Sequence, residues 1–445
     1  MQQIKNIHPV DEMLPLGQLF TYGLQHVLAM YAGAVAVPLI LANALGLSSE
    51  QLIYLINADL FTSGIATLIQ TLGVWKMGVR IPLVQGVTFA AITPMILIGK
   101  SHGLTGIYGS IIVAGLVTFL ISPYFSRFIR FFPPVVNGSI ITIIGISLLP
   151  VAVRWAGGGN PVAKNFGDPQ FIGIAFMVLL IVVFCYRVFK GFLSNIAVLM
   201  GLIAGTLLAI PMGLTDFAGV SSAAWIGITT PFAFGMPTFD FISIVSMVLV
   251  MLVVMTETTG DIIAVGEIVE KPITQDDLKQ GLRADGFSTM LGGIFNAFPY
   301  TAFAQNVGLV GLTRVKSRYV VAAAGVILII LGLFPKVAAL VAAVPAAVLG
   351  GAGIAMFGMV IASGIKTLSK VRFEGTQNIM VVAISIAVGI IPLAVPGFYQ
   401  KFPSWSQVIL NSGITAGSIT AIILNAFLNG STATANEPPT RQEYL

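Results

Sequence analysis

Charged residues are scarce in this chain of 445 residues: Asp, Glu, Lys and Arg make up 9% of it, whereas apolar residues make up 56%. An ordinary soluble domain has about 25% charged and 45–50% apolar residues. A soluble fold could not keep that much apolar surface from water, and the alternative solvent is lipid. The composition therefore excludes an ordinary soluble protein and predicts an all-α protein that crosses a membrane many times.

The sequence also lacks the residues and motifs of several catalytic classes. It has a single cysteine, Cys185, and three histidines without a Cys/His cluster, so we expect neither an internal disulfide nor a metal site. A G-x-S-x-G nucleophile elbow and a phosphate-binding P-loop are absent, which argues against a hydrolase and against ATP as the energy source. The net charge of +5 comes without a basic cluster, so no nucleic acid is expected. We therefore predict no enzyme activity and no cofactor.

Apolar runs between charged turns predict fourteen transmembrane segments in one membrane unit, residues 1–445. A spanning helix needs about 20 mainly apolar residues. The longest strongly polar stretch between segments, Glu267 to Arg283, is too short for a soluble domain. The predicted segments lie near residues 16–41, 52–72, 81–99, 106–121, 132–151, 171–186, 195–213, 241–263, 285–298, 300–313, 319–334, 337–363, 378–395 and 408–428.

The basic residues divide unequally between the two sets of loops that these segments create. Seventeen of the 22 Lys and Arg residues fall on the side of the N-terminus, and the other side holds Lys100, Arg154, Lys164, Lys336 and Lys401. Cytoplasmic loops carry the excess of Lys and Arg in membrane proteins. This partition predicts that both termini are cytoplasmic.

Two features recur in the two halves of the chain. Pro133-Pro-Val-Val-Asn-Gly138 and Pro345-Ala-Ala-Val-Leu-Gly350 share the pattern P-x-x-V-x-G, and each opens a Gly-rich apolar segment. The third and tenth segments are both short and interrupted by Pro and Gly, and Pro82 and Pro299 each favour extended backbone before them. The tenth segment comes seven places after the third, an odd number, so the two have opposite orientations in the membrane. Inverted repeats with broken helices at matching places indicate the substrate site of a transporter.

Ionisable side chains within predicted segments are costly in lipid and point to function. Glu257 and Asp261 lie four residues apart, which places both carboxyl groups on one face of a helix. Two carboxyl groups at such a short distance in a low-dielectric site do not readily both ionise. We therefore expect a bound proton or a cationic partner there. A structural hydrogen-bond network is the alternative for this pair. Asp285 either caps the helix that it begins or takes part in a proton relay.

Several uncharged polar residues and one aromatic residue lie at the same predicted depth. His26, in the middle of the first segment, is either a packing residue or an active one. Phe89 is either a packing residue or a stacking face for a ligand. Uncharged donors and acceptors suit a planar ligand with both kinds of edge group, and they are provided by Gln85, Thr88, Gln305 and Asn306.

These residues resemble the motifs of the nucleobase-ascorbate transporter family, also called nucleobase:cation symporters. Gln305-Asn306-Val-Gly308-Leu-Val-Gly-Leu-Thr313-Arg314 fits the family pattern Q/E-N-x-G-x4-T-R/K/G. Further matches cover nearly the full length of the chain: Gln25-His26, Gln85-Gly-Val-Thr88-Phe89 and Glu257-Thr-Thr-Gly260-Asp261.

The resemblance implies a fold and a set of residue roles. It implies a seven-plus-seven inverted repeat, short strands with half-helices at segments 3 and 10, a homodimer, a core domain (about 15–125 and 240–335) and a gate domain (about 130–215 and 337–430). Glu257 and Gln305 match side chains that hydrogen-bond the base, Phe89 and Ala304 match positions that offer backbone amides, and Asn306 looks like the support for Glu257. His26, Asp261 and Asp285 match positions tied to proton coupling or to organising the site.

The resemblance is strongest to the bacterial xanthine and uric acid branch. Gln305 stands where uracil carriers have Glu, and an amide tolerates an anionic purine better than a carboxylate does. Thr88 stands where some xanthine carriers have Asn, and together with the run from Glu257 to Asp261 this favours uric acid. The stretch from Gly292 to Asn306 also resembles Gram-positive-type xanthine permeases, so both purines stay candidates. The expected activity is proton-coupled uptake across the bacterial inner membrane by an elevator-like movement. The alternatives are an anion channel or exchanger of the same architecture and a carrier of uracil or another nucleobase.

Overall fold

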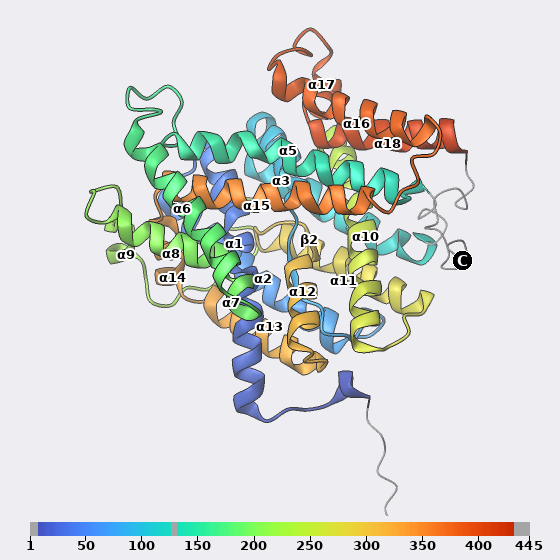
Figure 1. Ribbon diagram of the computed structural model, residues 1–445, viewed down its shortest axis with the longest axis horizontal. Coiled ribbons are helices and arrows are strands. Elements are labelled where there is room, and N and C mark those ends of the chain that lie inside the picture. Colours follow the sequence, from blue (N-terminus) through green and yellow to red (C-terminus); the bar gives the residue numbers. More distant parts are fainter. Residues whose placement is uncertain (1–7, 126–130, 431–445) are drawn as a thin grey trace, which may run out of the picture.

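The computed structural model describes residues 8–125 and 131–430, and this part of the chain is predominantly helical (Figure 1). The elements in chain order are η1 (Pro9–Asp11), α1 (Leu16–Leu45), α2 (Ser49–Leu72), β1 (Gln85–Val87), η2 (Phe89–Ala91), α3 (Ile92–Ile121), η3 (Ser122–Tyr124), α5 (Pro134–Ala156), α6 (Pro169–Val188), α7 (Phe192–Asn195), α8 (Ala197–Ala209), α9 (Ala218–Ser222), α10 (Phe241–Val269), α11 (Gln275–Ile294), β2 (Tyr300–Ala302), α12 (Ala304–Thr313), α13 (Arg318–Gly332), α14 (Pro335–Ala342), α15 (Ala346–Leu368), α16 (Gln377–Ala394), α17 (Ser404–Leu410) and α18 (Gly413–Asn429).

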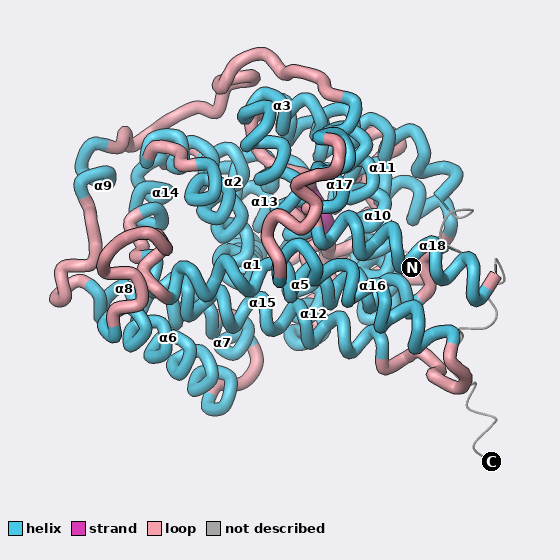
Figure 2. The backbone as a smooth tube through the Cα atoms, turned by 90° about the horizontal axis from the view of Figure 1, so that it is seen from above, coloured by secondary structure: helices cyan, strands magenta, loops and turns pink. Residues whose placement is uncertain are grey.

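Two groups of helices pack against each other. In the first group α2 lies along α13, and α3 lies along α10 and α11, with α1 against α13. In the second group α5 lies along α15, α6 packs on α8 and α15, and α16 packs on α18. Figure 1 shows α5 and α15 running side by side across α1, α10 and α12, and Figure 2 shows the same two helices beside α16, away from α2, α3 and α11. The division of these helices into a core and a gate domain stays a prediction.

The two strands lie inside the first group and pair with each other. β1 and β2 are antiparallel, with Gln85 opposite Ala302 and Val87 opposite Tyr300. Because a ladder of three residues is marginal by itself, side chains of the neighbouring helices must hold it. Ser63 Oγ of α2 donates to the carbonyl of Gln85 at 2.6 Å, and the N–H of Ala302 donates to Thr258 Oγ1 of α10 at 3.2 Å. A short strand is thus present at each predicted place.

The glycines of the P-x-x-V-x-G pattern bring α5 and α15 into close contact. A Cβ atom on Gly138, in the first turns of α5, would lie 2.7 Å from Leu368 Cγ at the end of α15. A Cβ atom on Gly350, in the first turns of α15, would overlap the backbone of Ala156 at the end of α5. The start of each helix therefore packs on the end of the other, and only glycine permits this distance.

We expect Gly350→Ala to destabilise the protein, because the backbone of Ala156 cannot move away as a flexible side chain would. Overpacking of this kind costs about 1–3 kcal/mol. The measurement is the thermal unfolding of the detergent-solubilised protein by fluorescence-detected size exclusion. Gly358→Ala is the matched control on α15, since a Cβ atom there meets nothing within 4 Å. Equal melting temperatures of the two variants would contradict the close α5–α15 contact.

The boundary between the predicted segments 319–334 and 337–363 is wrong. The structure has α13 and α14 joined by a bend of 82° and starts α15 at Ala346. Two prolines cause this division: Pro335 is the first residue of α14, and Pro345 is the N-cap of α15. Proline fits the first turn of a helix but interrupts its interior, so the break falls before residue 346.

The polar stretch from Glu267 to Arg283 is helical at both ends rather than a long loop. α10 continues to Val269, and α11 begins at Gln275 behind a capping box formed by Thr274 and Asp277. Asp285 therefore lies in the middle of α11, and its predicted role as a helix cap is wrong. The S/T-x-x-D/E signal of a capping box explains the early start of this helix.

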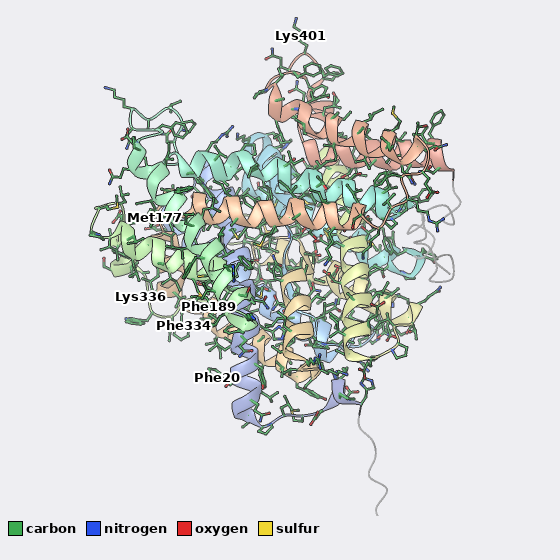
Figure 3. The ribbon with its side chains drawn as sticks, in the orientation of Figure 1. Phe20, Met177, Phe189, Phe334, Lys336 and Lys401 are labelled. Atoms are coloured by element: carbon green, nitrogen blue, oxygen red, sulfur yellow. The ribbon has the colours of Figure 1, made fainter. Side chains whose placement is uncertain are left out.

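Eight helices of the described residues are long and apolar enough to cross a membrane, or nine if the bent pair α13–α14 counts as one span. α3 joins the predicted third and fourth segments, with a break at Gly103, whose φ is 68°. Large apolar side chains face outward, as Met177 (48% exposed) and Phe20 (59%) do, which suits a surface in lipid (Figure 3). In Figure 3 Lys401 lies at the opposite end of the molecule from Phe20. The count of fourteen and the sidedness stay predictions.

Candidate functional site

A cavity of about 580 Å³ lies between the two groups of helices. The first group contributes α1, α10 and the two strand ends, and the second contributes α5, α6 and α15, with the α7–α8 region closing one side. Among the residues predicted for the site, those that line the cavity are Thr88, Phe89, Glu257, Asp261, Ala304 and Gln305. The antiparallel strands bring these segments together although they are far apart in the sequence.

Two helix beginnings face the cavity directly after the strands. Thr88 Oγ1 accepts the N–H of Ala90 at 3.2 Å and so caps the turn that leads from β1 into α3. Ala304 and Gln305 are the first residues of α12, and both are exposed to the cavity. The first N–H groups of a helix have no partner within it and carry a partial positive charge. The cavity wall therefore offers backbone donors at both half-helices.

α10 places two carboxyl groups on the cavity wall. Glu257 and Asp261 lie one turn apart and are half-buried, and Asp261 is within electrostatic range of both Glu257 and Asp285. Within residues 8–125 and 131–430 no ion pair includes any of these three carboxylates. Uncompensated charge in a low-dielectric site is costly, so a proton or a ligand group is needed to neutralise it.

His26 and Asn306 form a buried pair behind the cavity wall. The Asn306 Nδ2 group donates to the carbonyl of His26 at 2.9 Å and lies 3.0 Å from its Nδ1 atom. When the amide donates to Nδ1, the proton of the neutral ring is on Nε2. Asn306 was expected to support Glu257, but no hydrogen bond joins these two residues in the described chain. Its observed contact instead fixes α12 to α1.

Asp285 and Gln85 also lie behind the cavity wall rather than in it. Gln70 Nε2 of α2 donates to Asp285 Oδ1 at 3.3 Å and to the carbonyl of Gly281 at 3.2 Å. The Gln85 side chain is fully buried beside this carboxyl group, and its backbone N–H donates to Thr67 Oγ1 at 3.0 Å. Both residues thus join α2 to the elements that carry the cavity, and direct contact with a ligand would require movement.

The signature from Gln305 to Arg314 covers α12 from its second residue to its C-cap. Gly308 lies on its exposed side, and Thr313 Oγ1 donates to the carbonyl of Leu309 at 2.9 Å. Arg314 ends the helix in the left-handed conformation (φ 55°), and its N–H donates to the carbonyl of Val310 at 3.0 Å. The end of the signature therefore shapes the C-terminus of α12, whereas its beginning faces the cavity.

Sequence reasoning missed three polar residues. Asn137 of α5 lines the cavity and accepts a hydrogen bond from Thr256 Oγ1 of α10 at 3.0 Å, which joins the two helix groups. Lys370, two residues beyond α15, is the basic residue among the described lining residues. Asp59 is buried in α2. Its position inside a predicted span was a signal that could have found it, since ionisable residues there point to function.

Comparison with known sequences identifies related proteins along nearly the whole chain. The profile of the family Xan_ur_permease, described as a permease family, matches residues 17–398. The uric acid transporter UacT of Escherichia coli is 48% identical over 95% of this chain and 88% of its own. The xanthine permease of Bacillus subtilis is 48% identical over 93% of this chain and 94% of its own, and the uric acid permease PucK of the same species is 47% identical over 92% and 95%. These relatives are transporters, not enzymes.

Solved structures show the same fold at low sequence identity. The transmembrane domain of the cyanobacterial bicarbonate transporter BicA gives a TM-score of 0.62 at 16% identity, over 93% of this chain and 99% of that one. The murine anion transporter Slc26a9 gives 0.60 at 12% identity, over 94% and 69%. With this fold, with several apolar helices long enough to span a bilayer, and with relatives that match throughout, the chain belongs to the Xan_ur_permease (nucleobase-ascorbate transporter) family of multi-pass membrane transport proteins.

Proposed function

We propose that this protein takes up an oxidised purine, uric acid or xanthine or both, across the bacterial inner membrane by proton symport. The observation that carries the proposal is the cavity that both half-helices border, because Phe89, Glu257 and Gln305 all line it. The names of relatives at 45–48% identity, which are uric acid and xanthine permeases, support the same substrate class.

The groups on the cavity wall match the chemistry of a purine. The Gln305 amide provides a donor and an acceptor, Glu257 provides acceptors, and the backbone N–H groups of Phe89 and Ala304 provide donors. The ring of Phe89 offers a stacking surface. Lys370 adds positive charge at another part of the cavity lining, which would attract an anionic purine.

Transport follows from protonation and movement of the first helix group. A proton taken up in the Glu257, Asp261 and His26 region accompanies purine binding, and the loaded core (about 15–125 and 240–335) then moves past the gate (about 130–215 and 337–430). Fourteen segments in a seven-plus-seven repeat, cytoplasmic termini and a homodimer complete this proposal. The antiparallel pairing of β1 with β2 supports the inverted repeat.

The rival function is an anion channel or exchanger, and the shared fold with BicA and Slc26a9 favours it. Both half-helix beginnings would then bind an anion without proton coupling. Glu257 argues against this function, because without proton uptake its carboxylate stays ionised and repels anions in the same cavity. A carrier of uracil is a further alternative, with Gln305 as the residue that argues against it.

The test is the uptake of radiolabelled uric acid and xanthine by cells that express the full chain, with and without a protonophore. Proton symport predicts uptake above that of empty-vector cells, abolished by the protonophore. Uptake of either purine that persists with the protonophore would overturn proton coupling. Uptake of uracil or bicarbonate in place of both purines would overturn the substrate assignment.

We expect Gln305→Glu to abolish the uptake of anionic urate. Like unit charges 4 Å apart repel by about 4 kcal/mol near a protein surface, so the loss should exceed roughly 100-fold. Initial rates of labelled urate uptake at equal surface expression measure it. Gln377→Glu makes the same change at the exposed beginning of α16 and should leave the rate unchanged. An unaltered urate rate in Gln305→Glu would remove this residue from the binding site.

A further inference from the structure

Asp59 of α2 and Tyr300 of β2 form a buried hydrogen-bonded pair away from the cavity lining. The Tyr300 hydroxyl donates to Asp59 Oδ1 at 2.9 Å and to the backbone carbonyl oxygen of Asp59 at 3.1 Å. Asp59 is 1% exposed and Tyr300 is fully buried. The contact joins residues that are 241 positions apart in the chain.

Tyr300 is tied to three elements at once. Its hydroxyl contacts α2, its backbone N–H donates to Thr289 Oγ1 of α11 at 3.1 Å, and it pairs with Val87 in the sheet. A strand of three residues has too few ladder bonds to fix its own position. These side-chain contacts therefore decide where β2 lies between α2, α10 and α11.

The position of β2 determines the cavity wall that follows it. Thr301, Ala302 and the first residues of α12 line the cavity immediately after Tyr300 in the chain. A displacement of Tyr300 would move the backbone of Ala304 and the side chain of Gln305 by a similar amount, because one short strand and one turn connect them. Groups that bind a ligand lose affinity when their support permits movement of about 1 Å.

Asp59 is the ionisable member of this support. Its Oδ2 atom has no hydrogen-bond partner in the described part of the chain, and no described ion pair includes it. Its contact with Tyr300 is therefore the interaction that accounts for a carboxyl group at this depth.

We propose that Asp59 is a positioning residue for the substrate: through Tyr300 it fixes β2 and thereby the cavity wall formed by Ala302, Ala304 and Gln305. Asp59 does not touch the ligand. This inference rests on one part of the proposed function, namely that the cavity is the substrate site. It does not depend on which substrate binds there.

The experiment compares the concentration for half-maximal uptake and the maximal rate in four variants of the full chain at equal surface expression. Asp59→Ala and Tyr300→Phe should each raise the half-saturating concentration at least about tenfold with little change in maximal rate, a factor that corresponds to 1.4 kcal/mol. Asp59→Asn keeps an acceptor oxygen and should stay within about threefold of the wild type. Thr71→Val is the control, since this buried hydroxyl of α2 bonds within its own helix.

The double variant Asp59→Ala/Tyr300→Phe should bind no more weakly than the weaker single variant, because both changes remove one interaction. An unchanged half-saturating concentration in Tyr300→Phe would overturn the proposal, and so would an Asp59→Asn variant as impaired as Asp59→Ala. If Asp59→Ala fails to fold, Tyr300→Phe and Asp59→Asn still decide. If the wild type carries uracil or bicarbonate instead of a purine, the proposed function fails, and the same comparison is made with that substrate.

Discussion

Glu257→Gln is expected to abolish the accumulation of purine against a gradient while leaving the cavity intact. In proteoliposomes with an imposed gradient of one pH unit, each coupled proton supports about tenfold accumulation, since one pH unit is worth about 1.4 kcal/mol. The wild type should approach this ratio, and the variant should only equilibrate the purine, with a ratio of about one. The quantity to measure is the internal-to-external purine ratio at steady state.

The physical reason lies in the surroundings of α10. Glu257 and Asp261 share the cavity wall, and Asp261 is also within electrostatic range of Asp285. In the described chain no basic side chain is paired with any of the three. A glutamine keeps the size of Glu257 and its ability to hydrogen-bond, but it cannot take up and release a proton. Loss of purine accumulation with retained purine binding is therefore the result that identifies Glu257 as the proton-coupling group.

The matched control is Glu267→Gln, the same change on the same helix. Glu267 lies near the end of α10, is exposed and does not line the cavity, so this variant should accumulate purine as the wild type does. Protection of purified Glu257→Gln from thermal denaturation by purine would show that it still binds. A Glu257→Gln variant that accumulates purine at the wild-type ratio would rule out this coupling scheme.

The sequence predicted those features of the fold that depend on neighbouring residues in the chain, such as extended segments and most helices. Pro82 and Pro299 indicated extended backbone at membrane depth, and a three-residue strand follows each of them. The alternation of apolar segments and charged turns predicted most helices, although Pro335 and Pro345 divide α14 from α15 at another place. Helix ends were missed where capping residues, such as Thr274 and Asp277, extended a helix into a polar stretch.

The partners of buried polar residues could not be predicted, because they depend on how distant segments pack. The cavity lining includes Phe89, Glu257 and Gln305, and their predicted contact with a substrate stays a prediction. Asn306, however, contacts His26 rather than Glu257. Tertiary packing also decides that Asp285 meets Gln70. The sequence places such residues at a depth in the membrane, and only the packed helices show which side of a strand or helix each one faces.

Gly86→Ala is expected to weaken purine binding by roughly 5- to 150-fold, the effect of about 1–3 kcal/mol of overpacking. Gly86 lies in the middle of β1, and a Cβ atom there would overlap the ring of Phe303, with the Cε2 atom 2.7 Å away. Phe303 is the N-cap of α12 and lines the cavity, so a displaced ring must enter the cavity or separate the two strands. The half-saturating concentration for uptake measures the effect.

The Phe303 ring has no alternative place on its other side. A Cβ atom on Gly33 of α1 would lie 2.8 Å from Phe303 Cζ, so the ring is held between two glycines. Gly173→Ala on α6 is the control, because a Cβ atom there meets nothing within 4 Å. A shorter side chain at position 303 should relieve the overlap. The double variant Gly86→Ala/Phe303→Leu is therefore expected to regain part of the affinity lost in Gly86→Ala, because substitutions of residues in contact are not additive. If the double variant instead shows the sum of the two single losses of affinity, the ring does not transmit the effect of residue 86 to the cavity.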